Sequence, residues 1–355
     1  MPGSRYIPDR VHLVGSIGLD TVEQVFETVG PELGRRLKRV PDGEPGGRRL
    51  WAAWQYPLLR ANPYLRPDPS GAVRKNSRLP QMCLGEGVKP EELRFSELGY
   101  AREARASYDD FVAAREAGKI PEQARFQVCL PTPIAVTYSF CTPRDLIAIT
   151  DAYEKAMLRE AEMIYRHIPN PDLSLQWDLC QEMIILDGQP QDEFSTLEAS
   201  KQQVLERIRT LCSTVPKNVS LGFHLCYGDF GAKHFIEPED MAKLVEMANA
   251  LSQLIAHKIS YVHMPVPLSR TDDEYFKPLV DLKLDPDTEV YLGLIHLSDG
   301  AEGARRRIDT AHKYLKSFGV GTECGMARAR TEEIVQSLLA IHTEVATEPV
   351  SASST

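Results

Sequence analysis

The segments VSLGFHL at 219–225 and KISYVHM at 258–264 decide the fold of this chain. Each is a short apolar run rich in β-forming residues, and the residues between them, from about 238 to 256, have a helical pattern. A strand, a helix and a second strand in this order are typical of a βαβ unit, whose strands are parallel. The pair therefore predicts βα units and a parallel sheet.

The same alternation continues in both directions along the chain. The other apolar runs are RVHLVG near 10–15, RLKRV at 36–40, RFQVCL at 125–130, LSLQWD at 173–178, VYLGLIHL at 290–297 and VGTEC at 320–324. Helical patterns follow at 19–30, 143–167, 200–213, 303–319 and 331–344. Eight strands with helices between them is the number that a closed (β/α)8 TIM barrel requires.

One stretch breaks this rhythm. Residues 57–124 are rich in Pro, Gly and Arg, and a helical pattern lies near 98–117. The hydrophobic content of this stretch is thin for an independent core, so we interpret it as an insertion after the second strand. We therefore expect a single α/β barrel domain over 1–344, followed by a disordered tail at 345–355.

Charge and cysteine usage exclude several classes of protein. The net charge of −9 argues against nucleic acid or an anionic membrane surface as partner, because both need basic patches. No window approaches the roughly 20 apolar residues that span a bilayer, and MPGSRYIPDR has no apolar signal segment. Seven scattered cysteines, an odd number, do not form a secreted disulfide framework. We expect a cytoplasmic protein with reduced thiols.

Polar and titratable side chains follow nearly every predicted strand. Functional residues of such barrels come from the carboxyl ends of the strands and the loops after them. The residues at these ends are Gly15, Ser16, Asp42, Gly43, Glu44, Asp178, Glu182, His224, Cys226, His263, His296, Asp299 and Cys324. Their recurrence at one rim predicts that the active site lies there.

Four of these residues are potential metal ligands. His224 and Cys226 are two positions apart on an extended segment, so they point the same way and can share one ion. Alone, a His-x-Cys pair is more often a core histidine beside an inert buried thiol. Cys324 and His263 end two other predicted strands, and an imidazole and thiolate set suits Zn²⁺. The sequence therefore predicts a zinc site formed by all four.

Three further rim residues each allow two interpretations. Asp178 either anchors a substrate ammonium or acts as a base, or it is a helix cap or salt-bridge partner. Glu44, in the Gly-rich turn DGEPGG, is either part of the site or a solvated loop acid. His296 is either a general acid with a pKa near neutrality or a hydrogen-bonding neighbour of the site. Residues interpreted as packing or incidental are Trp51, Trp54, Cys83, Cys129, Cys141, Cys180 and Cys212.

Seven motifs, in chain order, resemble the catalytic barrel of cobalamin-independent methionine synthase, in the superfamily that also holds uroporphyrinogen decarboxylase. They are VGSIG at 14–18, DGEP at 42–45, LPTPIAVTYSF at 130–140, QWDLCQE at 176–182, HLCY at 224–227, GLIHLSD at 293–299 and ECGMARAR at 323–330. The resemblance covers most of the chain outside the insertion and the tail.

The resemblance implies a role for each matching residue. Gly15 and Ser16 would contact an amino acid substrate, and Glu44 and Asp178 would bind its ammonium group. His296 would be the acid, and the segments around His224, Cys226 and Cys324 would hold the metal.

Two departures from the family pattern stand out. The family has a glutamate as its fourth ligand, where His263 fits here, and QWDLCQE lacks the E-P that follows the family's aspartate. Two Cys, one His and one Glu around Zn²⁺ give a formal charge of −1, whereas two Cys and two His give zero. We therefore expect a bound thiolate to be more acidic but less nucleophilic here.

These observations lead to one functional hypothesis and two alternatives. The first is a zinc-dependent transferase that moves a methyl or alkyl group to a substrate thiol of the homocysteine type. The chain has no counterpart of the family's separate amino-terminal barrel, and such short members resemble enzymes with a non-folate methyl donor, such as a corrinoid. One alternative is a lyase or decarboxylase on the same barrel. The other is a non-catalytic metal-binding or thiol-sensing protein.

Overall fold

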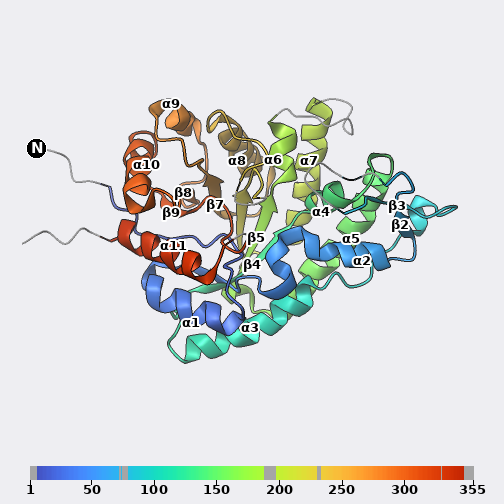
Figure 1. Ribbon diagram of the computed structural model, residues 1–355, viewed down its shortest axis with the longest axis horizontal. Coiled ribbons are helices and arrows are strands. Elements are labelled where there is room, and N and C mark those ends of the chain that lie inside the picture. The colour runs from blue at the N-terminus through green and yellow to red at the C-terminus, as the bar shows by residue number, and fades with distance from the viewer. Residues whose placement is uncertain are drawn as a thin grey trace, which may run out of the picture.

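Seven parallel strands form one curled sheet, and helices lie around it (Figure 1). The computed structural model describes residues 6–71, 73, 79–187, 197–229, 233–328 and 330–347. The sheet runs in the order β1 (Arg39–Pro41), β4 (Arg125–Pro131), β5 (Leu173–Leu179), β6 (Ser220–Leu225), β7 (Ile259–Pro265), β8 (Glu289–Ile295) and β9 (Gly319–Thr322). Neighbours in this order are neighbours in sequence apart from the insertion, which is consistent with a TIM-like barrel.

Helices connect these strands. The longer ones are α1 (Val22–Leu33), α3 (Tyr100–Glu116), α5 (Leu146–His167), α7 (Leu197–Cys212), α8 (Ala242–Leu254), α10 (Gly300–Tyr314) and α11 (Glu332–Val345). Shorter ones are α2 (Tyr56–Ala61), α4 (Pro133–Phe140), α6 (Gln181–Leu186) and α9 (Asp273–Phe276), and the 3-10 segments are η1 (Gly34–Arg36), η2 (Gly46–Gln55), η3 (Pro90–Glu92), η4 (Pro143–Asp145), η5 (Asn170–Asp172) and η6 (Lys277–Asp281). None of the helices in the described residues combines the length and apolar character needed to cross a bilayer.

The prediction of seven of the eight strands is confirmed, and that of the first is wrong. The segment near 10–15 makes only single parallel bridges, from Val11 to Leu37 before β1 and from Val11 to Val320 of β9. The backbone N–H of His12 also donates to the carbonyl of Val320 at 2.9 Å. The apolar pattern is that of a strand, but one bridge on each side does not make a ladder. The segment nevertheless contacts both edges of the sheet.

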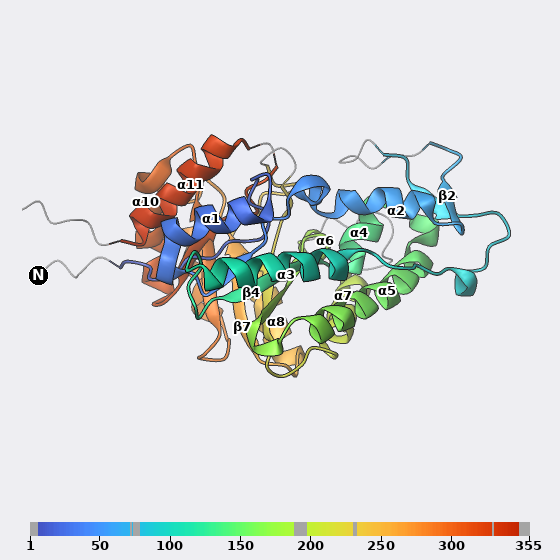
Figure 2. The same cartoon turned by 90° about the horizontal axis from the view of Figure 1, so that it is seen from below.

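The region between β1 and β4 contains more structure than its composition indicates. It holds η2, α2, a small antiparallel pair of β2 (Leu65–Pro67) with β3 (Met82–Leu84), and α3, which confirms the helix expected near 98–117. Figure 2 shows α3 running beside α1 and towards α5, so this region packs on the main body. Of the tail expected at 345–355, the first residue still belongs to α11, and 348–355 lie outside the described residues.

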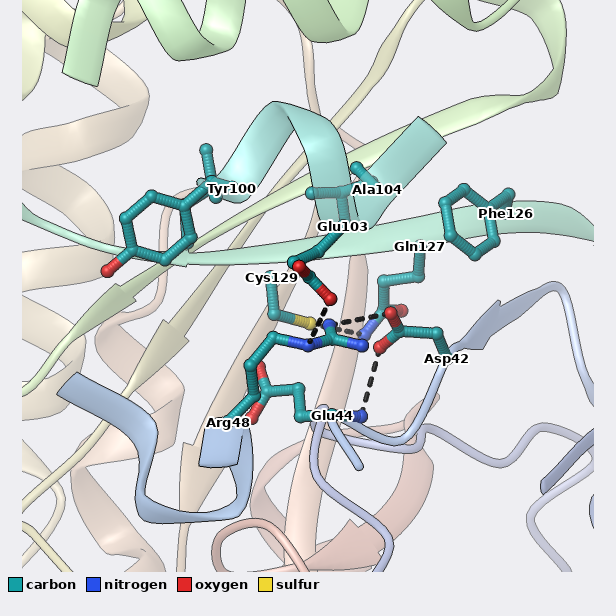
Figure 3. Close-up of a pocket in the computed structure, with 11 residues that line it drawn as sticks. Asp42, Glu44, Arg48, Tyr100, Glu103, Ala104, Phe126, Gln127 and Cys129 are labelled. Atoms are coloured by element: carbon teal, nitrogen blue, oxygen red, sulfur yellow. Dashed lines mark hydrogen bonds and ion pairs between the residues drawn. The ribbon is translucent and has the colours of Figure 1, made fainter. Parts of the chain in front are cut away.

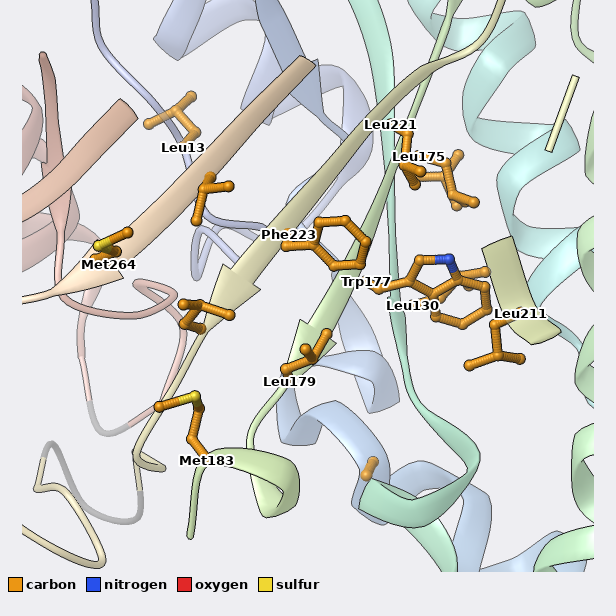
Figure 4. Packing of buried hydrophobic residues seen from close by; sticks show 14 of the residues in the cluster. Leu13, Leu130, Leu175, Trp177, Leu179, Met183, Leu211, Leu221, Phe223 and Met264 are labelled. Atoms are coloured by element: carbon orange, nitrogen blue, oxygen red, sulfur yellow. The ribbon is translucent and has the colours of Figure 1, made fainter. Parts of the chain in front are cut away.

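Successive side chains of β5 point alternately towards the apolar core and towards the interior of the curled sheet. Leu175, Trp177 and Leu179 belong to the large apolar core, and Figure 4 shows Trp177 near Leu130 of β4 and Leu211 of α7. Truncating a buried side chain of this size costs about 3–5 kcal/mol. The residues between them, such as Gln176 and Asp178, therefore point to the opposite face, which is the interior of the curled sheet.

Below the site, a network of polar side chains fills this interior. The guanidinium of Arg39 lies 4.0 Å from the ring centre of Tyr261 and pairs with Glu289 at 2.6 Å. Higher up, the side-chain oxygen of Gln176 is 2.9 Å from Nε2 of His12 and 3.2 Å from the hydroxyl of Tyr261. Because this end is filled, open space remains at the carboxyl ends of the strands.

Candidate metal and substrate site

Three potential metal ligands meet at the carboxyl ends of β6 and β9. His224 is near the end of β6, Cys226 follows that strand, and Cys324 follows β9. Their ligand atoms all lie within 4.8 Å of one another. The two sulfur atoms are 3.7 Å apart. The structure thus brings together three of the four side chains that the sequence assigns to a metal site, across almost 100 residues of chain.

Local backbone geometry holds Cys226 in this position. Its N–H donates to the carbonyl of Leu179 at 3.0 Å, which extends the β5–β6 pairing beyond the end of the strand. Its Sγ accepts from the N–H of Gly228 at 3.2 Å. Gly228 has φ +93°, and a Cβ there would lie 2.3 Å from the ring of Phe235. Only glycine fits this turn, which carries the chain away from the site.

The donor set and its environment fit a thiophilic ion. Nε2 of His224 is buried and has no hydrogen-bond partner among the described residues. An unpaired buried polar atom is costly unless something binds it. One imidazole with two thiolates is the set that Zn²⁺ prefers. Within the described part of the chain, no other group of three or more His, Cys, Asp or Glu side chains gathers in this way.

His263 lies beside this group rather than in it. On neighbouring strands His224 and His263 are register partners, so their rings stand at the same level, with the two Nδ1 atoms 2.8 Å apart. A Cβ at Gly321 would lie 3.3 Å from Nε2 of His263, so that nitrogen faces the backbone of β9. Burial lowers the pKa of His263 to about 3. The structure therefore places this neutral imidazole where it can form a hydrogen bond with the potential metal ligand His224. His263 is not one of the grouped ligands, although we expected four ligands including it.

Two buried carboxyl groups, those of Asp178 and Glu44, line the cavity that His224, Cys226 and Cys324 also line. Asp178 accepts hydrogen bonds from the side chain of Gln176 at 2.8 Å and from the indole N–H of Trp51 at 3.1 Å. Burial raises the pKa of Asp178 to about 7. Burial, and then the charges of Asp178 and Asp42, raise the pKa of Glu44 to about 8. In the described part of the chain neither carboxyl has a salt-bridge partner, and this leaves both available to a ligand cation.

The turn that carries Glu44 is tightly fixed. Asp42 accepts from the N–H of Glu44 at 3.0 Å, from Arg48 at 2.7 Å and from the hydroxyl of Ser107 at 2.7 Å. Figure 3 shows Asp42, Glu44 and Arg48 around a small pocket next to the main cavity. Glu44 and Trp51 are the two non-glycine residues with positive φ in the described chain, at +51° and +53°. Such strain costs about 1–3 kcal/mol and concentrates at functional sites.

Gly15 and Ser16 also line the cavity. Ser16 bridges to Gly43, and its carbonyl accepts from the N–H of Met326 at 2.6 Å. A Cβ at Gly325 would lie 2.2 Å from the Ser16 hydroxyl. The first segment of the chain is thus locked against the loop that carries Cys324.

The structure shows the surroundings of His296, for which the sequence allowed two interpretations. Burial lowers its pKa to about 4 rather than leaving it near neutrality. Its Nε2 donates to the carbonyl of Val266 at 2.9 Å, and its Nδ1 is 3.9 Å from Glu323. The pKa of Glu323 is itself raised to about 7 by burial. Of the two interpretations, the structure favours a hydrogen-bonding neighbour of the site.

The main cavity has a volume of about 560 Å³, which is large enough for an amino acid and a second reactant. The metal-ligand group and both carboxyls line it. Its wall includes Trp51, Tyr138 and Phe140, and the guanidinium of Arg328 lies 5.7 Å from the Trp51 ring. The interpretation of Trp51 as a packing residue missed this role. Its partner Asp178 is 127 positions away, so no local pattern could have revealed the contact.

Comparisons with known proteins show the fold. No protein-family model matches this chain, and no curated protein matches its sequence. The structure is similar to that of a candidate vitamin-B12-independent methionine synthase from Listeria monocytogenes, with a TM-score of 0.58 and 16% identity over 97% of this chain and 98% of that one. It is also similar to a B12-independent methionine synthase from Shewanella sp. W3-18-1 in complex with selenomethionine, with a TM-score of 0.58 and 12% identity over 96% and 97%. At such low identities the likeness is one of architecture.

Proposed function

We propose that this protein is a zinc-dependent transferase that moves a methyl or other alkyl group to the thiol of an amino-acid-like acceptor such as homocysteine. The observation that carries the proposal is that one cavity is lined by the group of His224, Cys226 and Cys324 and by the carboxyls of Asp178 and Glu44, which have no salt-bridge partner among the described residues. The first set suits a sulfur-binding metal, and the second suits an ammonium group. A thiol amino acid carries both features.

The chain's own residues would divide the work between the two ends of the acceptor. Zn²⁺ held by His224, Cys226 and Cys324 would lower the pKa of the acceptor thiol and keep it as a thiolate, which is the reactive form. At the other end, Asp178 and Glu44 would bind the ammonium group, and the hydrogen bond from Trp51 would keep Asp178 in place. The Shewanella structure holds selenomethionine, an amino acid with an alkylated chalcogen, and this supports an acceptor of that shape.

The proposal also covers the methyl donor and the closure of the barrel. The donor stays what the family resemblance implies, a corrinoid or another non-folate methyl carrier. We propose that the segment near 10–15 takes the eighth position of a closed barrel, supported by its bridges to both edges of the sheet. We also keep the proposal of one domain over 1–344 with 57–124 as an insertion.

The direct test is to purify the protein, measure its zinc content and follow the loss of free thiol when homocysteine is mixed with methyl donors. We expect about one zinc per chain and donor-dependent S-methylation, identified by mass spectrometry. A protein that binds no metal and alkylates no thiol would remove the proposal. A protein that binds metal but acts only on a non-thiol substrate would favour the lyase alternative, which the pKa values near 7 of Asp178, Glu182 and Glu323 also fit.

Amino acid binding is expected to release protons. At pH 7 the empty site holds Asp178 and Glu44 partly protonated, because their pKa values are about 7 and about 8. An ammonium group binds the ionised forms, so roughly one proton should leave the carboxyls per molecule of methionine bound, and homocysteine should release one more when its thiol binds the metal as a thiolate. Titration calorimetry in buffers of different ionisation enthalpy measures this number. The variant Asp178→Asn should release fewer protons, and binding without proton release would contradict the assignment of the carboxyls.

His263 is expected to act through His224. If His224 binds the ion through Nε2, its Nδ1 keeps a proton and donates it to Nδ1 of His263. Losing such a partner typically costs 10–100-fold in metal affinity. We expect that loss for His263→Leu and a smaller one for His263→Gln, whose amide oxygen can still accept.

The matched control is His342→Leu, because His342 is equally buried but lies on α11, away from the site. Chelator competition measures the affinities. If His263 were itself a ligand, Gln would not rescue, and the loss would be as large as that for a cysteine ligand.

A further inference from the structure

Cys180 lies beside the metal-ligand group, at the point where the chain leaves the sheet. It directly follows β5 and caps the start of α6, and it is 2% exposed. In β5 and β6, Asp178 is the register partner of His224, and the hydrogen bond between Leu179 and Cys226 continues this pairing. Cys180 and Cys226 therefore stand at the same level on adjacent segments.

The two thiols contact each other. Together with Ile184 they form a small buried cluster, separate from the main core, against which Trp51 and Cys324 pack. Cys226 thus has Cys324 at 3.7 Å and Cys180 as a further contact, and all three cysteines line the same cavity.

The group of His224, Cys226 and Cys324 has one ligand fewer than the four that are usual for zinc. Protein zinc sites have four ligands, or three with a position left for solvent or substrate. Since His263 turns towards His224, the described residues supply three ligand atoms within 4.8 Å of one another. A thiol next to a bound dication loses its proton, and thiolates are the preferred donors in sites of this composition.

We propose that, in the acceptor-free protein, Cys180 is a further ligand of the metal, so that His224, Cys226, Cys324 and Cys180 hold it together with three thiolates. This rests on the proposed function, because it assumes that the group binds metal. Cys180 is not part of the group within 4.8 Å, so its side chain has to turn towards the other three when the ion binds.

The third thiolate changes the charge of the site. Two thiolates and one imidazole leave Zn²⁺ formally neutral, and a third thiolate makes the total −1. That equals the charge of a site with two thiolates, one imidazole and one carboxylate. Cys180 would therefore supply the negative charge that the neutral His263 does not, and a site of −1 donates more electron density to whatever else the metal binds.

Cobalt substitution counts thiolate ligands directly. Co²⁺ bound to thiolates absorbs in the near ultraviolet through sulfur-to-metal charge transfer, with an intensity that rises with each thiolate. We expect an intensity for three thiolates in the wild type, about one third less in Cys180→Ser, and no change in Cys212→Ser. Serine is close to cysteine in size, and Cys212 is a buried thiol in the main core, at the end of α7. This makes the two variants a matched pair.

Each result decides the question. A wild-type intensity of two thiolates, unchanged in Cys180→Ser, would overturn the role of Cys180 and leave the proposed function standing. A wild type that binds no Co²⁺ would overturn both. If Cys180→Ser does not fold, alkylation of the wild type with and without Zn²⁺ replaces it, since the metal should protect Cys180 as well as Cys226 and Cys324. Alkylation of Cys180 in the zinc-loaded protein would also reject the proposal.

Discussion

Replacing Cys324 or Cys226 with serine is expected to lower the affinity for Zn²⁺ by about 10²-fold or more. Structural zinc binds with an apparent free energy of about 10–16 kcal/mol, which is about 2.5–4 kcal/mol for each of four ligands. Removing one thiolate should forfeit at least that share, because the serine hydroxyl remains protonated and is a poor ligand. The two residues serve one ion, so the double variant should lose less than the sum of the single losses.

Two measurements test this prediction. Competition with a chelator gives the affinity, and thermal unfolding with and without chelator gives the stabilisation that the bound metal confers. Chelator should lower the unfolding temperature of the wild type by more than that of Cys324→Ser, because the variant binds zinc more weakly. Cys212→Ser is the control, because it removes a buried thiol of the main core without touching the site. Equal zinc retention in Cys324→Ser and Cys212→Ser would show that the group of His224, Cys226 and Cys324 is not a metal site.

The strands were predictable because their signal is local. The alternation of β5 places Trp177 in the core and Asp178 in the interior, and this period of two is visible in LSLQWD itself. The helices α4 and α6 were not expected, because each begins within two residues of a strand end and is short. The segment near 10–15 has the composition of a strand, but whether it pairs depends on both sheet edges, which are far away in sequence.

The candidate site, like the fold, could be predicted from the sequence only in part. The grouping of His224, Cys226 and Cys324 follows from which strands end at the rim, and strand order is a consequence of the βα alternation. The orientation of His263 does not follow from the sequence, because its register with His224 depends on an irregularity in the β6–β7 pairing after Leu221. Cys180 and Trp51 escaped detection for a related reason. Their contacts join segments that are far apart in the sequence, and neither residue forms a recognisable metal-ligand pattern with its sequence neighbours.

Replacing Glu44 with glutamine is expected to stabilise the ligand-free protein, and more so as the pH rises. The folded state raises the pKa of Glu44 to about 8, whereas the unfolded chain has the ordinary value of about 4.3. The folded state therefore binds one more proton than the unfolded state between these values. Its free energy of unfolding falls as pH rises through this window, by about 1.4 kcal/mol per pH unit at most. Below pH 4 the two states bind this proton equally, and the contribution is fully present.

Glutamine resembles the protonated glutamate and does not titrate, so the variant should escape this loss. The difference between Glu44→Gln and the wild type should grow by about 3.5 kcal/mol from pH 5 to pH 8. Measuring a difference removes the opposite effect of the buried histidines, because both proteins contain them. Chemical unfolding at several pH values gives the two curves, and Glu302→Gln, on an exposed position of α10, controls for the change of net charge. A difference that stays flat with pH would mean that Glu44 is not a buried acid. A growing difference, together with weaker amino acid binding by the variant, would show that the fold bears the cost of this carboxyl because the site needs it.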